Sequence, residues 1–190
     1  MSFALTIPTP ENPLSITLEN GTSTVFVGAN GSGKSRLAIH IEDQIGEAAH
    51  RISAHRALTL NPGVPKISEN VALKGLRFGH AGDEANIAYR FQHRWHQKTA
   101  TSLLNDFDFL VQALFAEQSR TALQTHNNVR AGTAHEAAAT KFEKMKAIWH
   151  ALIPHRNLII DGDDIKVQAS EGALLYSATE MSDGERAIFT

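Results

Sequence analysis

The sequence predicts an α/β fold that combines an antiparallel β layer, a glycine-rich loop and a large helical insertion. Three observations predict it. Apolar residues alternate through the first part of the chain, as they do in paired strands. The octapeptide GANGSGKS follows a β-branched stretch and precedes a segment with helical spacing. A second alternating region, NLIIDGDDIKVQ, appears after a long and mainly helical middle.

The first two expected strands lie at residues 3–7 and 14–18, where apolar side chains occupy every second position. Asn20-Gly21 is a residue pair typical of a tight hairpin turn. We therefore expect residues 22–27, TSTVFV, to form the strand that ends in the glycine-rich loop. After the loop, residues 35–48 show helical spacing, and residues 51–60 predict another strand that stops at a proline-glycine breaker.

The middle of the chain, residues 68–153, is expected to be mainly helical, with loops near 79–82 and 127–132. The segment AHEAAATKFEKMKAIWHAL predicts one helix from its apolar stripe. That stripe comprises Phe142, Met145, Ile148 or Trp149, and Leu152. The chain then divides into three parts of one incomplete domain: 1–56 with the β layer, loop and first helix, 57–155 with the helical insertion, and 156–190 with a hairpin and a final motif.

Composition limits the function. The chain has 190 residues, of which 42% are hydrophobic and 20% charged, as in globular proteins. It has no cysteine, which excludes disulfides and thiolate metal sites and fits a cytoplasmic location. We see no signal peptide and no apolar run long enough for a membrane helix. The net charge of −2 argues against a domain-wide nucleic-acid surface.

The octapeptide satisfies the phosphate-binding pattern G-x-x-x-x-G-K-[ST] in full. Its glycines allow backbone N–H groups to point at phosphate oxygens, and the helix that follows adds a partial positive charge. Lys34 would reach the β- and γ-phosphates, and the Ser35 hydroxyl would bind Mg²⁺. The sequence thus predicts a site for ATP and Mg²⁺. Its residues are Gly28, Ala29, Asn30, Gly31, Ser32, Gly33, Lys34, Ser35 and Arg36.

A second motif, MSDGERA, lies at residues 181–187. Taken alone it is a helix start, with Ser182 as the cap and Glu185 completing a capping box. The pairing of GANGSGKS with this later motif resembles the ABC-type ATPases of the RecF, SMC and OLD-like group, whose signature often reads L-S-x-G-E. Met181 stands here where leucine is usual.

The resemblance implies an ATPase that dimerises around ATP. In that group the signature of one subunit contacts the γ-phosphate held by the P-loop of another. Ser182, Gly184 and Glu185 would then bind nucleotide in trans, and the protein would be a homo-oligomer. The resemblance also implies a bacterial antiphage or DNA-maintenance role with a nuclease or other effector partner. The family's Walker B strand would follow Thr190, so we expect this chain alone to have negligible ATPase activity.

Residues 158–164, LIIDGDD, offer an alternative Walker B strand. Asp161-Gly162 favours a hairpin turn instead, and the segment precedes the signature, which is the wrong order for the family. We expect a hairpin here. The catalytic carboxylates therefore remain unassigned.

Three weaker signals have plain alternatives. Residues 87–98 mix basic and aromatic side chains, as nucleic-acid binders do, but their spacing favours an amphipathic helix with Ile87, Phe91 and Trp95 towards the core. His93 and His96 lack a third metal ligand at a telling spacing. His55 and Arg56 follow an expected strand near the P-loop, so Arg56 is either a nucleotide or effector sensor or a surface cation. A Gln that senses Mg²⁺ stays unassigned among Gln92, Gln97, Gln112 and Gln118.

Two rival functions remain open at this stage. The first is a nucleotide-sensing scaffold that binds ATP without turnover. The second is a small-molecule or nucleoside kinase, which shares the P-loop but has no use for the terminal SDGE.

Overall fold

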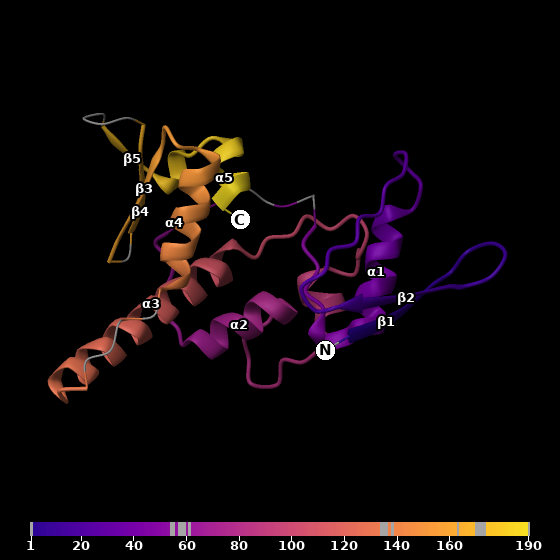
Figure 1. Ribbon diagram of the computed structural model, residues 1–190, viewed down its shortest axis with the longest axis horizontal. Coiled ribbons are helices and arrows are strands. Elements are labelled where there is room, and N and C mark those ends of the chain that lie inside the picture. The colour runs from indigo at the N-terminus through magenta and orange to yellow at the C-terminus, as the bar shows by residue number, and fades with distance from the viewer. Residues whose placement is uncertain are drawn as a thin grey trace.

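The computed structural model describes residues 2–53, 56, 60, 62–133, 137, 139–162, 164–169 and 174–189. These residues form a mixed α/β structure with one two-stranded and one three-stranded antiparallel sheet. No helix within the described ranges has the length and apolar character that crossing a bilayer requires. Figure 1 shows α1 (Lys34–Ile45) with the first sheet at one side, and α4 (Lys141–Leu152) with the second sheet at the other.

Both of the first two expected strands form, and β1 (Ser2–Ile7) pairs with β2 (Leu14–Glu19) in an antiparallel sheet, with Leu5 opposite Ile16. The turn at Asn20-Gly21 also forms, with Gly21 at φ 84°. The strand expected next, at residues 22–27, does not. Within the described chain those residues pair with no strand, and Val25 and Val27 are 79% and 89% exposed. Strand-forming side chains need a neighbouring strand, and here there is none.

Helix α1 begins at Lys34, as the sequence predicts, and packs on β1. The two are joined by hydrogen bonds to the exposed backbone of Thr6. The Gln44 side chain accepts from Thr6 N at 2.9 Å and donates to Thr6 O at 2.8 Å. His40 Nε2 lies 2.9 Å from the same carbonyl oxygen. These contacts fix the orientation of the helix that follows the glycine-rich loop.

The prediction of an amphipathic helix at residues 87–98 is wrong. Only η2 (Arg90–Arg94) is helical there, and it is a single π-type turn. Of the three residues expected towards the core, only Trp95 is buried, and Ile87 and Phe91 are exposed. Arg90 and Arg94, expected on the outer face, are buried. Arg90 donates to the carbonyls of Gly46 and Ala49 at 2.9 and 2.8 Å, beyond the end of α1. Carbonyls at helix ends lack intrahelical donors, and guanidinium groups satisfy them here.

Arg94 stabilises the end of α2 (Glu69–Phe78) in the same way, through the carbonyl of Leu76. It also contacts Asp106 Oδ2 at 3.2 Å. The other oxygen of Asp106 accepts from Arg56, at 2.7 Å from its Nη2. Arg56 is thus a buried partner of Asp106, and its side chain is only 9% exposed. Most of the strand expected at residues 51–60, including His55, lies outside the described residues.

Asp106 precedes α3 (Phe107–Arg130), the longest helix of the described chain. Helix α4 starts at Lys141, later than expected. Thr140 and Glu143 form a capping box that defines this start, with the Thr140 N–H donating to Glu143 Oε2 at 2.6 Å. Trp149 is 1% exposed and occupies the core, whereas Ile148 is 58% exposed. Of the two alternatives for the apolar stripe, Trp149 is therefore the core residue.

The expected hairpin at residues 158–168 is confirmed. Strand β3 (Asn157–Asp161) pairs with β4 (Asp164–Gln168), with Asp161 opposite Asp164 and Gly162 at φ 59° in the turn. Residues 158–164 are therefore no Walker B strand. Strand β5 (Leu175–Ser177) extends the sheet and is followed by η3 (Ala178–Glu180) and α5 (Asp183–Phe189).

One hydrophobic core unites the middle and the end of the chain. It is built around two large aromatic side chains, Phe107 of α3 and Trp149 of α4. Ile165 of β4, Met181 and Phe189 pack into the same cluster. The helical middle and the C-terminal hairpin thus share a core, while α1 and the glycine-rich loop lie outside it.

Candidate phosphate-binding site

The glycine-rich loop has the backbone that a phosphate cradle needs. Gly31 and Gly33 adopt φ values of 82° and 92°, the left-handed region that other residues enter at a cost. Within the loop, the Ser32 N–H donates to the carbonyl of Ala29 at 3.1 Å. A Cβ on Gly28 would come within 2.6 Å of Ser32 Oγ, so the tight curve of the loop also favours glycine there.

Lys34 folds back across this loop. Its Nζ donates to the carbonyl oxygens of Gly28 and Ala29, both at 2.8 Å. The ammonium group therefore lies against the first two residues of the motif, five and six positions earlier in the chain. Two hydrogen bonds to exposed carbonyls hold it there.

The start of α1 is left open to an anion. Gly33 precedes the helix, offers no capping side chain, and the first turn contains no acidic residue. Two other helices differ: α2 is capped by Ser68, and α4 carries its Thr140–Glu143 box. Helix α3 also lacks a side-chain cap, but its first turn carries the acidic Asp108. The first N–H groups of a helix have no intrahelical acceptor and attract negative charge. The end of α1 is therefore suited to a phosphate group.

A hollow of about 390 Å³ opens beside Lys34. Ser32, Gly33 and Arg36 border it on the loop side. The opposite side is largely apolar and is formed by Ile7, Pro8, Phe26, Val27, Leu37 and His40. Sequence reasoning missed these residues, because they meet only through the packing of α1 on β1.

The expected magnesium site rests on Ser35 alone. Ser35 is exposed and lies in the first turn of α1. Across the described parts of the chain, no three His, Asp or Glu side chains cluster closely enough to hold a metal. The residues present thus fit a Mg²⁺ ion that is shared with a phosphate, with Ser35 as one ligand.

The signature motif forms a self-contained helix start. Ser182 Oγ accepts from the Glu185 N–H at 3.3 Å, and Glu185 Oε2 accepts from the Ser182 N–H at 2.8 Å. This is the capping box that the sequence predicts. The other carboxylate oxygen accepts from the Tyr176 hydroxyl at 2.5 Å and lies 3.4 Å from Arg156 Nε.

Electrostatics reinforce this arrangement. Burial alone would raise the pKa of Glu185, but the hydrogen bonds from Tyr176 and Ser182, with the Arg156 charge, lower it. Glu185 is therefore an ionised internal partner that faces its own chain. Ser182 and Gly184 remain exposed.

The structure keeps the two motifs apart. The glycine-rich loop precedes α1, which packs on β1, whereas Met181 and Phe189 beside the signature belong to the core with Trp149. Figure 1 shows α1 and α5 in separate parts of the molecule. The chain thus does not bring Ser182 and Gly184 to its own Lys34.

Among the described residues, His93 and His96 belong to no group of three side chains that could hold a metal ion. His93 stacks on Tyr89 with ring centroids 5.1 Å apart, and Tyr89 stacks on His80 at 5.2 Å. His80 also contacts Glu84 Oε1 at 2.8 Å. These rings form a small surface cluster that holds the loop after α2.

Comparisons with protein-family models, with curated proteins and with solved structures give no match for this chain.

Proposed function

We propose that the chain binds ATP with Mg²⁺, and that the loop at residues 28–35 holds the phosphates. The observation that carries the proposal is the position of Lys34. Its ammonium group contacts the carbonyls of Gly28 and Ala29, and the helix that begins at Lys34 has no side-chain cap. A cation and an uncapped helix N-terminus then lie together at the glycine-rich loop. That arrangement is what a polyphosphate requires.

On binding, Lys34 Nζ would exchange its bonds to Gly28 and Ala29 for bonds to β- and γ-phosphate oxygens. The N–H groups around Gly31 and Gly33 would donate to the same phosphates, and Ser35 would ligate Mg²⁺. The apolar side of the hollow, with Phe26 and Val27, gives the base a surface to lie on. Both residues are exposed and therefore accessible to a ligand.

The resemblance to ABC-type ATPases extends the proposal to a dimer. Ser182 and Gly184 are exposed and far from the loop of their own chain, so a nucleotide contact by them would have to come from a second copy. Ser182 would then donate its hydroxyl to a phosphate, while its hydrogen-bond partner Glu185 stays with Tyr176 and Arg156.

A second function, ATP binding without turnover by this chain, is favoured by one observation. The described residues around the hollow beside Lys34 include no carboxylate. Attack by water on a γ-phosphate needs a group that orients the water. The described lining offers no carboxylate for this step, so ATP would act here as a ligand.

Competition binding tests the proposal. A fluorescent ATP analogue is bound to the protein with Mg²⁺ and displaced with ATP, ADP or AMP. Because the cradle binds phosphates, we expect ATP and ADP to compete at least about tenfold better than AMP. Equal competition by AMP, or no binding of the analogue, would contradict the proposed site.

Phosphate release separates the two functions. The protein is incubated with Mg²⁺ and ATP, and inorganic phosphate is measured over time. Binding without release supports the scaffold. Steady release that Lys34→Ala abolishes would show that the chain is an ATPase by itself.

A further inference from the structure

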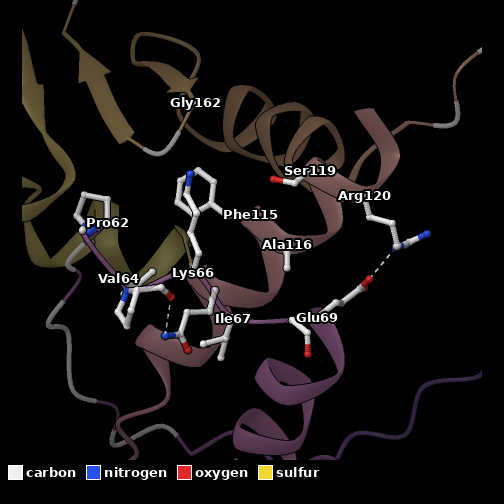
Figure 2. Close-up of a pocket in the computed structure, with 14 residues that line it drawn as sticks. Pro62, Val64, Lys66, Ile67, Glu69, Phe115, Ala116, Ser119, Arg120 and Gly162 are labelled. Carbon is white, nitrogen blue, oxygen red and sulfur yellow. Dashed lines mark hydrogen bonds and ion pairs between the residues drawn. The ribbon is translucent and has the colours of Figure 1, made fainter. Parts of the chain in front are cut away.

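A second cavity, unrelated to the phosphate loop, lies between the segment before α2 and the helix α3. Its volume is about 410 Å³, within the usual range for small-molecule sites. Figure 2 shows the labelled Val64, Lys66 and Ile67 on one side and Phe115, Ala116 and Ser119 of α3 on the other. Gly162, in the turn between β3 and β4, closes the end of the cavity. It shares no lining residue with the hollow beside Lys34.

The cavity walls suit a flat apolar group. Val64 and Phe115 are partly buried and pack against the main core, so they are held in place from behind. The ring of Phe115 and the side chains of Ile67 and Ala116 line the space between the two segments. An aromatic ring system placed there would meet Phe115 on one side and aliphatic groups on the other.

One buried polar atom in the wall needs a hydrogen-bond donor. Gln112 lines the cavity and is 8% exposed. Its Nε2 donates to the carbonyl of Pro65 at 3.1 Å, which fixes the orientation of the amide. Its Oε1 is buried and has no hydrogen-bond partner among the described residues. A buried acceptor without a donor is costly, so a ligand N–H would be favoured at this atom.

The charges at the cavity favour an anion. Glu69 is the acidic residue of the lining, and it is already paired with Arg120 at 2.9 Å and with Lys141 at 3.3 Å. Partial burial would raise the pKa of Glu69, but these two hydrogen bonds lower it. Lys66 has no carboxylate within ion-pair distance among the described residues. Its positive charge is left for a ligand.

These observations specify one ligand class. The geometry points to a site for a small aromatic acid that carries a ring N–H. The ring would lie against Phe115, the N–H would donate to Gln112 Oε1, and the carboxylate would contact Lys66. This inference is independent of the proposed ATP binding, and either can fail alone.

Indole-3-acetate is the probe, because it has an aromatic ring, a ring N–H and a carboxylate. Two analogues each lack one feature: benzothiophene-3-acetate has sulfur in place of the N–H, and 3-methylindole has no carboxylate. Calorimetric titration of the protein should give saturable binding of indole-3-acetate. We expect each analogue to bind roughly tenfold more weakly, because each leaves one polar partner unmatched.

Variants of the protein show which residue causes each loss of affinity. Ser119→Trp fills the mouth of the cavity from the exposed face of α3 and should abolish binding of the probe. Lys66→Gln should bind indole-3-acetate and 3-methylindole with equal affinity. Gln112→Met should bind indole-3-acetate and benzothiophene-3-acetate with equal affinity. Lys144→Gln, an exposed lysine on α4, is the matched control and should leave every affinity unchanged.

The inference is overturned if the probe shows no saturable binding to the wild-type protein. It is also overturned if Ser119→Trp binds the probe as well as wild type does, or if wild type binds both acetates equally. The titrations of the wild-type protein with the probe and with its two analogues need no variant, so a poorly folded Gln112→Met would not prevent the test.

Discussion

The ammonium group of Lys34 donates a hydrogen bond of 2.8 Å to the carbonyl oxygen of Gly28, six residues earlier in the chain. This contact links the two ends of the glycine-rich loop. A long cationic side chain would otherwise extend into solvent, since this part of α1 is exposed. The loop is thus closed around its own cation before any ligand arrives, which reduces the ordering cost of binding.

The backbone of Gly33 gives the first prediction. Its φ of 92° strains any other residue, by about 1–2 kcal/mol. We expect Gly33→Ala to weaken ATP binding by at least about tenfold, because the loop must reopen to relieve the strain. Gly132→Ala is the matched control, since Gly132 follows α3 away from the loop, has a comparable φ of 70°, and an added Cβ there meets nothing within 4 Å. Equal ATP affinity of the two variants would show that the loop conformation is unimportant.

The buried arginines give the second prediction. Arg94 contacts Asp106 and the carbonyls of Leu76 and Arg51, and its side chain is 2% exposed. Arg94→Ala would leave a buried carboxylate with one partner fewer, which costs about 3–5 kcal/mol. Urea unfolding measures this loss. Arg77→Ala, at an exposed position of α2, should change the free energy of unfolding by less than about 0.5 kcal/mol.

If Arg94→Ala unfolds at the same urea concentration as Arg77→Ala, the buried network contributes nothing.

The Tyr176–Glu185 hydrogen bond gives a prediction on pH. Burial and the nearby Glu185 carboxylate raise the pKa of Tyr176 to about 12. A tyrosine in an unfolded chain ionises near pH 10. The raised value means that this contribution to stability is complete below pH 10 and is lost between pH 10 and 12.

The ultraviolet absorbance of tyrosinate, followed as the pH is raised, measures this pKa. The same titration of Tyr176→Phe gives the signal of the rest of the protein, which is subtracted. Glu185→Gln should move the pKa of Tyr176 down towards 10, because the negative charge is removed. A titration curve that is unchanged by Glu185→Gln would contradict the contact. Acid should also destabilise this contact. Because the pKa of Glu185 is lowered in the folded protein, the stability that Glu185 contributes is lost as the pH falls below the ordinary carboxylate range.

The signature motif gives a prediction on assembly. Ser182→Arg should leave ATP binding by a single chain within about threefold of wild type, because Ser182 lies far from Lys34. It should abolish ATP-dependent dimerisation, since a bulky cation would block the facing subunit. Light scattering with a non-hydrolysable ATP analogue measures the dimer. Thr179→Arg, at an exposed neighbouring position, controls for added charge.

Two results would refute the trans role. One is equal dimerisation of wild type and Ser182→Arg, and the other is loss of ATP binding in the variant chain itself. Ser182 would then serve only as the cap of α5, where its removal costs about 1 kcal/mol.

Local patterns predicted the local structure well. The strands at residues 3–7 and 14–18, the start of α1 near Lys34 and the hairpin at Asp161-Gly162 all follow from alternation, helical spacing or turn residues. The glycine-rich loop was likewise visible, because its chemistry depends on consecutive residues. The capping box at Ser182 and Glu185 is short-range in the same sense.

Long-range packing was not predictable from the same patterns. Residues 22–27 have strand-forming side chains, but a strand also needs a neighbour, and the described chain provides none. Arg90 and Arg94 look like an exposed basic face, yet they point inward because the carbonyls of Gly46 and Leu76 need donors. The signal in hindsight is the choice of arginine, which can satisfy several carbonyls at once.

The most direct measurement is calorimetric titration of wild type and Lys34→Ala with ATP and Mg²⁺. The lysine supplies charge-assisted hydrogen bonds worth about 1.5–3 kcal/mol, so its loss should weaken binding roughly ten- to hundredfold. Lys144→Ala, which removes an exposed lysine of α4, should bind ATP as wild type does. If Lys34→Ala and wild type bind ATP with equal affinity, the loop at residues 28–35 is not the nucleotide site.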